Sequence, residues 1–131
     1  MNKLFFPSIF HAEDTGFSVT VPDIDGCFTE GDTIEEAYLN AVEAIGLFFE
    51  EINDHKLEIP SISKASNLHC HEGEFLVLIE FDMLAYRKKH ENKAVKKTLT
   101  IPLWLNTLAE QQHINFSKVL QTALKEKLHI Q

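Results

Sequence analysis

The chain has 131 residues, enough for one or two small domains, and its net charge of −8 argues on average against binding to nucleic acid. The average hides an asymmetry. Residues 1–85 hold 17 acidic and three basic residues, a net charge of −14, whereas residues 86–131 hold nine basic and three acidic residues, a net charge of +6. This division indicates two surfaces with different partners: a basic half that can contact phosphates and an acidic half that favours a basic partner.

The sequence carries no apolar stretch of the length needed to span a bilayer. Its apolar start is broken at Pro7 and Ser8, before the hydrophobic region of a signal peptide would be complete. Cys27 and Cys70 lie far apart in the sequence and fit no disulfide framework. We therefore expect a cytoplasmic protein with reduced thiols.

The N-terminal part begins with a pattern typical of a β-hairpin. Residues 4–11 are rich in β-favouring apolar side chains, residues 13–16 are turn formers, and residues 17–21 alternate apolar and polar side chains. A third short strand is predicted at residues 27–30. The alternation predicts that one face of this sheet is buried.

A helix is predicted to follow the three strands. Thr33-Ile34-Glu35-Glu36 is a capping box, in which the Thr33 hydroxyl accepts from the Glu36 N–H and the Glu36 carboxylate reaches back. The helix is expected to end near residue 55 and to bury one apolar stripe, made of Ile34, Ala37, Tyr38, Ala41, Ile45, Phe48, Phe49 and Ile52. We expect Glu43 and Glu50 to face water.

After a predicted loop at residues 56–73, residues 75–81 form a continuous apolar run. Such a run is typical of a strand buried on both faces. The predicted order of the N-terminal part is therefore βββαβ. The charged segment 86–95 is interpreted as a linker that is helical in part.

Residues 96–101 alternate polar and apolar side chains, which is the period of a strand. Pro102 ends this strand and suits the first position of a helix, because its missing N–H is not needed there. Two helices are predicted to follow, at residues 103–112 and 116–128, and Asn115 is a good N-cap for the second. His113 occupies the turn between them, where a left-handed backbone would favour glycine.

One short strand and two helices cannot bury their apolar side chains alone, and a single strand leaves its N–H and C=O groups unpaired. A second copy solves both problems, because the two strands can pair antiparallel while four helices close one core. In this order of elements, the stretch resembles the ribbon-helix-helix family of DNA-binding proteins. The plainer alternative is an edge strand of one domain with solvated lysines.

The ribbon-helix-helix resemblance implies specific DNA contacts. Outward side chains of the ribbon read base edges in the major groove, which by position are Lys96, Thr98 and Thr100. The start of the second helix binds a phosphate through its backbone and its dipole. Phosphate contacts are expected from Asn115, Phe116, Ser117 and Lys118 at this helix start. A further phosphate contact is expected from Lys97, in the strand before Pro102.

The run from Val21 to Ala37 contains Pro22-Asp23, Gly26-Cys27, Gly31-Asp32-Thr33 and an acidic helix start. In this pattern the chain resembles the HicB antitoxin family, although Asp25 stands where most members have proline. The resemblance covers essentially the whole chain and implies an α+β fold. It implies a partial RNase H-like toxin-binding domain at residues 1–85 and a ribbon-helix-helix DNA-binding and dimerisation domain at residues 96–131.

The HicB resemblance also implies a function. The chain would be the antitoxin of a type II toxin–antitoxin system, whose N-terminal domain binds and blocks a small basic mRNA-cleaving toxin of the HicA kind. Its C-terminal domain would form a homodimer on palindromic operator DNA and repress its own operon. The resemblance implies no cofactor and no catalysis. It leaves open which residues contact the toxin and whether two dimers join into a tetramer.

Two chemical alternatives compete with this function. A divalent-metal nuclease of RNase H-like fold would need converging carboxylates, for which the candidates are Asp23, Asp25, Glu30 and Asp32. The run from His69 to Glu72 holds zinc-type ligands, but neighbouring residues of an extended chain point to opposite sides and no second ligand pair accompanies them. Neither a metal site nor a catalytic residue is therefore predicted.

Overall fold

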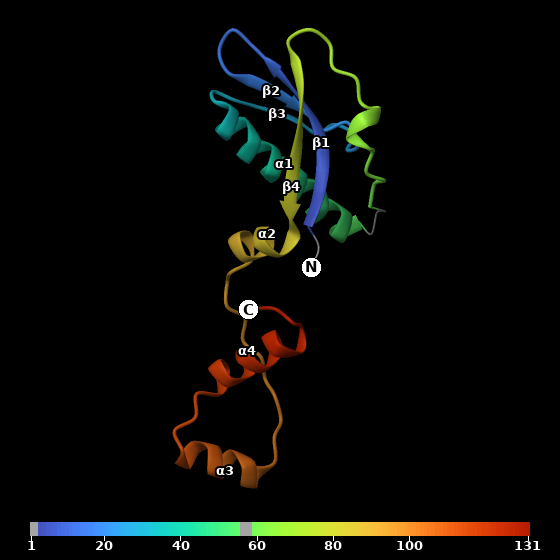
Figure 1. The fold of residues 1–131 in the computed structure, drawn as a ribbon. Helices are drawn as coiled ribbons and strands as arrows, with labels where there is room; N and C mark the ends of the chain where they lie inside the picture. The colour runs from blue at the N-terminus through green and yellow to red at the C-terminus, as the bar shows by residue number, and fades with distance from the viewer. Residues whose placement is uncertain (1–2, 56–58) are drawn as a thin grey trace. The chain divides into compact units, whose positions relative to one another are not determined.

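The computed structural model describes residues 3–55 and 59–131, so residues 56–58 of the predicted loop lie outside the described part. The chain divides into two compact units (Figure 1). We call Met1–Lys93 unit 1 and Ala94–Gln131 unit 2. Among the described residues, no helix combines the length and the apolar content needed to cross a membrane.

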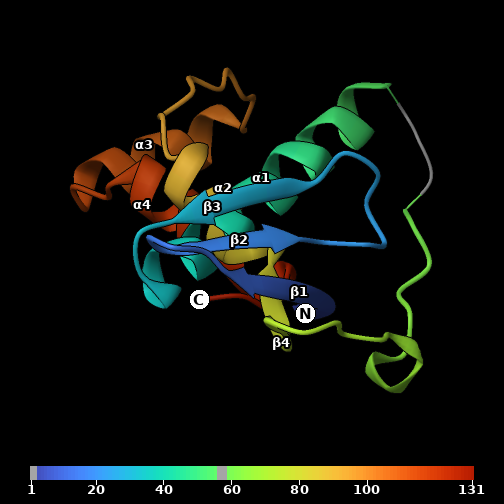
Figure 2. The ribbon, with the colours of Figure 1, turned by 90° about the horizontal axis from the view of Figure 1, so that it is seen from above.

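Unit 1 contains one antiparallel sheet with the strand order β3-β2-β1-β4 (Figures 1 and 2). Its strands are β1 (Lys3–Ala12), β2 (Phe17–Thr20), β3 (Phe28–Gly31) and β4 (Glu74–Asp82). Gly16 closes the hairpin between β1 and β2 at φ +84°, a conformation that favours glycine, and its C=O accepts from the Glu13 N–H at 3.0 Å. The predicted hairpin, third strand and βββαβ order are confirmed.

The helix α1 (Ile34–His55) covers one face of this sheet (Figure 2). One of the two predicted capping-box bonds is confirmed, because the Glu36 N–H donates to the Thr33 hydroxyl at 3.1 Å. The helix and the sheet enclose the core, in which the rings of Phe49 and Phe81 stack with centroids 5.1 Å apart. Burying each such ring contributes about 1.5–3 kcal/mol before conformational entropy is counted. The residues of α1 buried in this core are Ala37, Ala41, Ile45, Phe49 and Ile52.

The prediction that β4 is buried on both faces is wrong. Ile79 and Phe81 are fully buried under α1, but Leu78 on the opposite face is 49% exposed. Phe5 of β1, on the same outer face, is 48% exposed. The reason is that α1 covers a single face of the sheet. An apolar run cannot distinguish a strand covered on both sides from one covered on one side.

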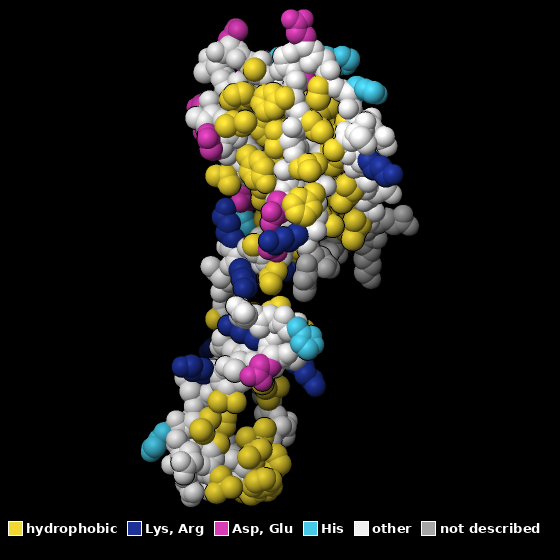
Figure 3. All heavy atoms as spheres, viewed as in Figure 1, with side chains coloured by type: hydrophobic (Ala, Val, Ile, Leu, Met, Phe, Trp, Pro, Cys, Tyr) yellow, Lys and Arg dark blue, Asp and Glu magenta, His cyan; other side chains and the backbone are white. Residues whose placement is uncertain are grey.

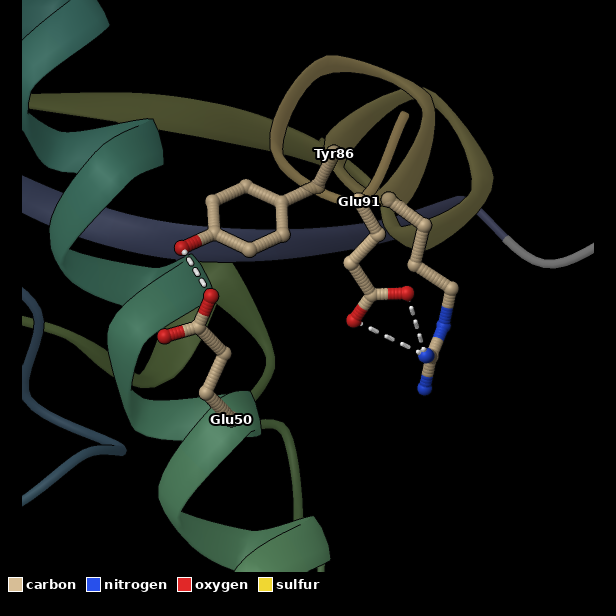
Figure 4. A network of polar contacts seen from close by, with 4 residues as sticks. Glu50, Tyr86 and Glu91 are labelled. Atoms are coloured by element: carbon tan, nitrogen blue, oxygen red, sulfur yellow. Dashed lines mark hydrogen bonds and ion pairs between the residues drawn. The ribbon is translucent and has the colours of Figure 1, made fainter. Parts of the chain in front are cut away.

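The helix α2 (Met83–His90) follows β4 directly and packs on α1. Its Tyr86 side chain is 7% exposed and lies over Gly46, where a Cβ atom would overlap the tyrosine ring. The Tyr86 hydroxyl donates to Glu50 at 3.1 Å (Figure 4). Residues 86–90, the start of the expected linker, are therefore part of unit 1. Residues 91–102 form neither helix nor strand within the chain.

Unit 2 contains α3 (Leu103–Gln111) and α4 (Phe116–Lys127), which confirms the two predicted helices. The Asn115 side chain caps α4 by accepting from the Lys118 N–H at 3.0 Å. His113 adopts φ +54°, the left-handed conformation expected at this turn. No residue of unit 2 is buried within the single chain.

Candidate interaction surfaces

The candidate base-reading residues Lys96, Thr98 and Thr100 lie in the segment between α2 and α3, together with Lys97. All four side chains are exposed. The segment pairs with no strand among the described residues, so the predicted strand at residues 96–101 stays a prediction. These exposed side chains are accessible to a partner. No hydrogen bond or ion pair with a described residue fixes the direction in which they point.

The candidate phosphate-binding residues gather at the N-terminus of α4. Asn115 occupies one backbone donor of the first turn, that of Lys118. The N–H groups of Phe116 and Ser117 make no hydrogen bond with any described residue. Free N–H groups at the positive end of a helix dipole favour an anion, and the exposed Lys118 side chain adds a positive charge beside them.

Unit 2 exposes an unusual amount of apolar surface for 38 residues. A groove along α4 is lined in part by Ile114, Val119 and Ala123. Contiguous apolar surface of this kind marks a protein interface. We call the following residues, each between 41% and 78% exposed, the apolar face of unit 2: Leu99, Ile101, Leu103, Trp104, Leu105, Leu108, Ile114, Phe116, Val119, Leu124 and Leu128.

The carboxylates considered for a nuclease do not converge. Asp23 instead accepts from Ser63 twice, from the backbone N–H at 2.8 Å and from the hydroxyl at 2.5 Å. These bonds tie the loop after β2 to the loop before β4. Within residues 3–55 and 59–131, no three His, Cys, Asp or Glu side chains form a group that could hold a metal ion, and His69 and His71 are exposed.

The two cysteines are free, as expected. Cys27 is buried beside the core, and burial raises the pKa of its thiol above the ordinary value. A raised thiol pKa lowers the thiolate fraction, so this side chain behaves as a small apolar packing group. Cys70 is exposed.

The sequence does not predict a charged cluster that lies between α1 and α2. Glu43 contacts Lys89 Nζ at 2.6 Å and His90 Nε2 at 2.8 Å. The hydrogen bond from Lys89, with a smaller contribution from His90, lowers the pKa of the Glu43 carboxyl. Glu43 and Glu50 therefore face water only in part, because both contact side chains of α2 and both are half-buried.

The boundary of unit 1 after Lys93 changes the charge division between the two parts. Four of the nine bases counted with the C-terminal half belong to unit 1: Arg87, Lys88, Lys89 and Lys93. Unit 1 then holds 18 acidic and seven basic residues, a net charge of −11, and unit 2 holds two acidic and five basic residues, a net charge of +3. The net charges of the two units have opposite signs, as expected. The difference between them is smaller than the difference between residues 1–85 and residues 86–131.

Comparison with known proteins agrees with this architecture. Residues 6–124 match the family described as the HicB-like antitoxin of bacterial toxin–antitoxin systems. A 14.9 kDa protein from the rep-hol intergenic region of Haemophilus phage HP1 is 30% identical over 105 residues, which are 78% of this chain and 76% of the phage protein.

Two solved structures extend the comparison. A chain of a toxin–antitoxin complex from Streptococcus pneumoniae has the same fold, with a TM-score of 0.60 at 24% identity over 96% of this chain and 99% of that chain. A chain of the HicA3–HicB3 toxin–antitoxin complex is 28% identical, with a TM-score of 0.53 over 60% of this chain and 99% of that chain. The family match spans both units, and the chain therefore belongs to the HicB-like antitoxin family.

Proposed function

We propose that this chain neutralises a HicA-like mRNA-cleaving toxin with unit 1 and represses its own operon with a dimer of unit 2. The observation that carries the proposal is the contrast between the two units. Unit 1 is closed around its own core and strongly acidic, whereas unit 2 is basic and leaves its apolar face open. An acidic unit with its own core suits a module that binds a basic toxin. A basic unit with an open apolar face suits a module that dimerises and binds DNA.

The acidic charge of unit 1 supports a basic partner, because complementary charge speeds association and excludes like-charged competitors. A relative of this family has been solved in a HicA3–HicB3 complex. The direct test is to co-express the chain with the protein encoded beside it and to purify by a tag on one of them. We expect a stable complex in which RNA cleavage is blocked. A neighbour that neither co-purifies nor loses activity would contradict the toxin assignment.

The apolar face of unit 2 supports dimerisation of the ribbon-helix-helix kind. A second copy would cover this face with four helices and would pair the two segments 96–101 as antiparallel strands. The backbone of this segment pairs with no strand in residues 3–55 or 59–131, as a strand completed by a partner requires. Sedimentation of the full chain is expected to give a dimer at micromolar concentration. Further association into tetramers through unit 1 would be visible in the same experiment.

We assign base reading to Lys96, Thr98 and Thr100 of the paired ribbon. We assign phosphate contacts to Lys97 and to the N-terminus of α4, from Asn115 through Phe116 and Ser117 to Lys118. A footprint on the promoter of the chain's own operon tests both assignments. Replacing the three base readers by alanine should change or abolish sequence preference, whereas Lys118→Ala should weaken binding to all sequences alike. An unchanged footprint with the triple variant would refute the base-reading assignment.

We propose no catalysis, no cofactor and a cytoplasmic site of action for this chain. The separation of Asp23, Asp25, Glu30 and Asp32 supports this against the nuclease alternative, since two-metal hydrolysis needs several carboxylates around ions about 4 Å apart. Incubation of the purified chain with RNA and DNA in magnesium or manganese is the test. Cleavage that is lost in Asp25→Asn would overturn the proposal.

A further inference from the structure

The strand β4 lies at one border of the sheet, with β1 on one side and no described strand on the other (Figure 2). In an antiparallel pair, the backbone groups of alternate residues point toward the partner strand and away from it. The Glu80 N–H donates to the Tyr38 hydroxyl at 3.0 Å and the Glu74 N–H donates to the His71 C=O at 3.0 Å. Neither bond goes to β1, so residues 74, 76, 78 and 80 turn their backbone groups to the free edge.

Pro7 provides an independent check of this direction. It pairs with Leu78 in the register of β1 and β4. Because proline has no N–H, its partner cannot belong to a pair that exchanges two hydrogen bonds. Leu78 therefore directs its N–H and C=O outward, and Leu76, two residues away, does the same.

The free edge of β4 is closed at its ends and open in its middle. The amides of Glu74 and Glu80 are occupied as described above, whereas those of Leu76 and Leu78 have no hydrogen-bond partner among the described residues. At the opposite border, β3 has only four residues, and the Asn40 side chain donates to the Glu30 C=O at 2.8 Å. The middle of β4 thus leaves two outward N–H groups, those of Leu76 and Leu78, without a partner among the described residues.

The side chains around this open edge give it a distinct chemistry. Leu76 and Leu78 lie on the outer face of the sheet beside Phe5, and hydrophobic side chains gather on this face over β4 and β1 (Figure 3). Glu74 and Glu80 flank the two leucines on the same face. Lys3 contacts Glu80 at 3.2 Å, with side chains 58% and 43% exposed, so this ion pair is open to solvent.

We propose that the partner toxin adds an extended strand to the middle of β4, at Leu76 and Leu78. This inference rests on the proposed function, because it assigns the place where unit 1 holds its toxin. Main-chain hydrogen bonds to the two leucines supply affinity, and alternate side chains supply specificity. The fitting strand carries two apolar residues in alternate positions that meet Leu76, Leu78 and Phe5. It carries Lys or Arg at the flanking positions, opposite Glu74 and Glu80.

A second copy of unit 1 is a poorer occupant of this edge. Two-fold antiparallel pairing of β4 centred on residue 77 would place Glu74 of one chain opposite Glu80 of the other, and like charges directly opposite are destabilising. Each copy of unit 1 also carries a net charge of −11. A basic strand from the toxin avoids both the pairing of like charges and the repulsion between two acidic units.

Amide hydrogen exchange of the full chain, alone and in complex with the toxin encoded beside it, tests the inference residue by residue. In the free chain, we expect the Leu76 and Leu78 amides to exchange much faster than those of Val77 and Ile79, which face β1. In the complex, exchange at Leu76 and Leu78 should slow by about tenfold or more. If a stable complex forms and these two amides keep their free rates, the inference fails while the antitoxin function stands. If no complex forms, both fail.

Leu78→Pro is the matching variant, because it removes the outward N–H without breaking the ladder between β4 and β1. Toxin binding should weaken at least about tenfold with Leu78→Pro and clearly less with Leu78→Ala, which keeps the donor and loses the apolar side chain. A folded Leu78→Pro variant with unchanged toxin affinity would overturn the inference. Should this variant fail to fold, the exchange rates in the wild-type complex decide. Protection that instead grows with the concentration of the chain alone would assign the edge to a second copy and would also overturn it.

Discussion

Unit 1 and unit 2 handle their apolar side chains in opposite ways. Unit 1 encloses a core that joins Phe6 and Phe10 of β1 to Ile45 of α1 and Phe81 of β4, all fully buried. In unit 2, Leu103 and Trp104 are 78% and 64% exposed, although they belong to the regular helix α3. A regular helix is therefore no sign that its apolar side chains are buried. The comparison supports the proposal that unit 2, unlike unit 1, gains its stability from association with a second copy.

The largest expected effect is on the core of unit 1. Phe81→Ala removes a fully buried ring that stacks on Phe49 and should lower the free energy of unfolding by about 3–5 kcal/mol. Urea unfolding followed by circular dichroism measures this loss. Since the core belongs to one chain, the loss should be the same at 2 µM and at about 100 µM protein, an ~50-fold range over which a dimeric core would respond. If the loss of unfolding free energy became smaller at the higher protein concentration, the core of unit 1 would depend on a second chain. That result would contradict the distinction between the two units.

Val119→Lys should have the next largest effect, and it should appear in unit 2. Val119 is 55% exposed in the single chain, but the proposed dimer buries it, and an unpaired buried lysine is strongly unfavourable. We expect the dimer dissociation constant, measured by sedimentation equilibrium, to rise by about 100-fold or more. Gln121→Lys adds the same charge away from the apolar face and serves as the control. Equal effects of the two variants would argue against this face as the interface.

Gly46→Ala tests the packing of α2 on α1. The added Cβ would overlap the Tyr86 ring, so the tyrosine or the whole of α2 must shift. Overpacking of this kind costs about 1–3 kcal/mol. A double-mutant cycle with Tyr86→Leu locates the effect, because the cost should fall when the ring is absent. A cost that is independent of residue 86 would place the strain elsewhere.

The two helix caps offer a matched pair, one in each unit. Thr33→Ala and Asn115→Ala each remove a side-chain acceptor from a first-turn N–H, and each should cost about 1 kcal/mol. The loss from Thr33→Ala should appear in the unfolding of unit 1 at any concentration. The loss from Asn115→Ala should appear as weaker dimerisation, because the proposed dimer holds unit 2 together. If both variants changed only the unfolding of unit 1, or both changed only dimerisation, the contrast between the two units would be contradicted.

The smallest expected effect is a dependence on pH. Lys89 and His90 lower the pKa of Glu43 in the folded chain below the reference value of 4.5. The ionised carboxylate therefore stabilises unit 1 above pH 4.5, and this contribution is lost as the pH falls through the lowered pKa. The melting temperature of wild type should fall more steeply below pH 4.5 than that of Glu43→Gln. Glu51→Gln, at an exposed position on the same helix, should keep the wild-type profile.

Elements with local signals were predictable from the sequence. The Thr33 capping box, the Asn115 cap, the turn at Gly16 and the alternation of β2 each depend on a few neighbouring residues. The left-handed turn at His113 was located for the same reason, although histidine rather than glycine fills it. Such features are encoded within one or two turns of chain, so no knowledge of the tertiary fold is needed to find them.

Features that depend on distant partners were not predictable. The sequence of α2 has a weak apolar pattern, and its docking depends on Gly46, which lies 40 positions before Tyr86. The exposure of Leu78 depends on the absence of a second helix layer, which an apolar run does not reveal. The proposed pairing of residues 96–101 would involve another chain, so neither the sequence nor a single folded copy can fix it.

The central claim is that residues 96–101 form a strand with the same segment of a second chain. Isotope-filtered NMR on an equal mixture of labelled and unlabelled full-length chains tests it most directly. The account predicts interchain contacts between backbone protons of this segment, in an antiparallel pattern, together with contacts between the α4 helices of the two chains. A segment that shows contacts only within its own chain, or none at all, would contradict it.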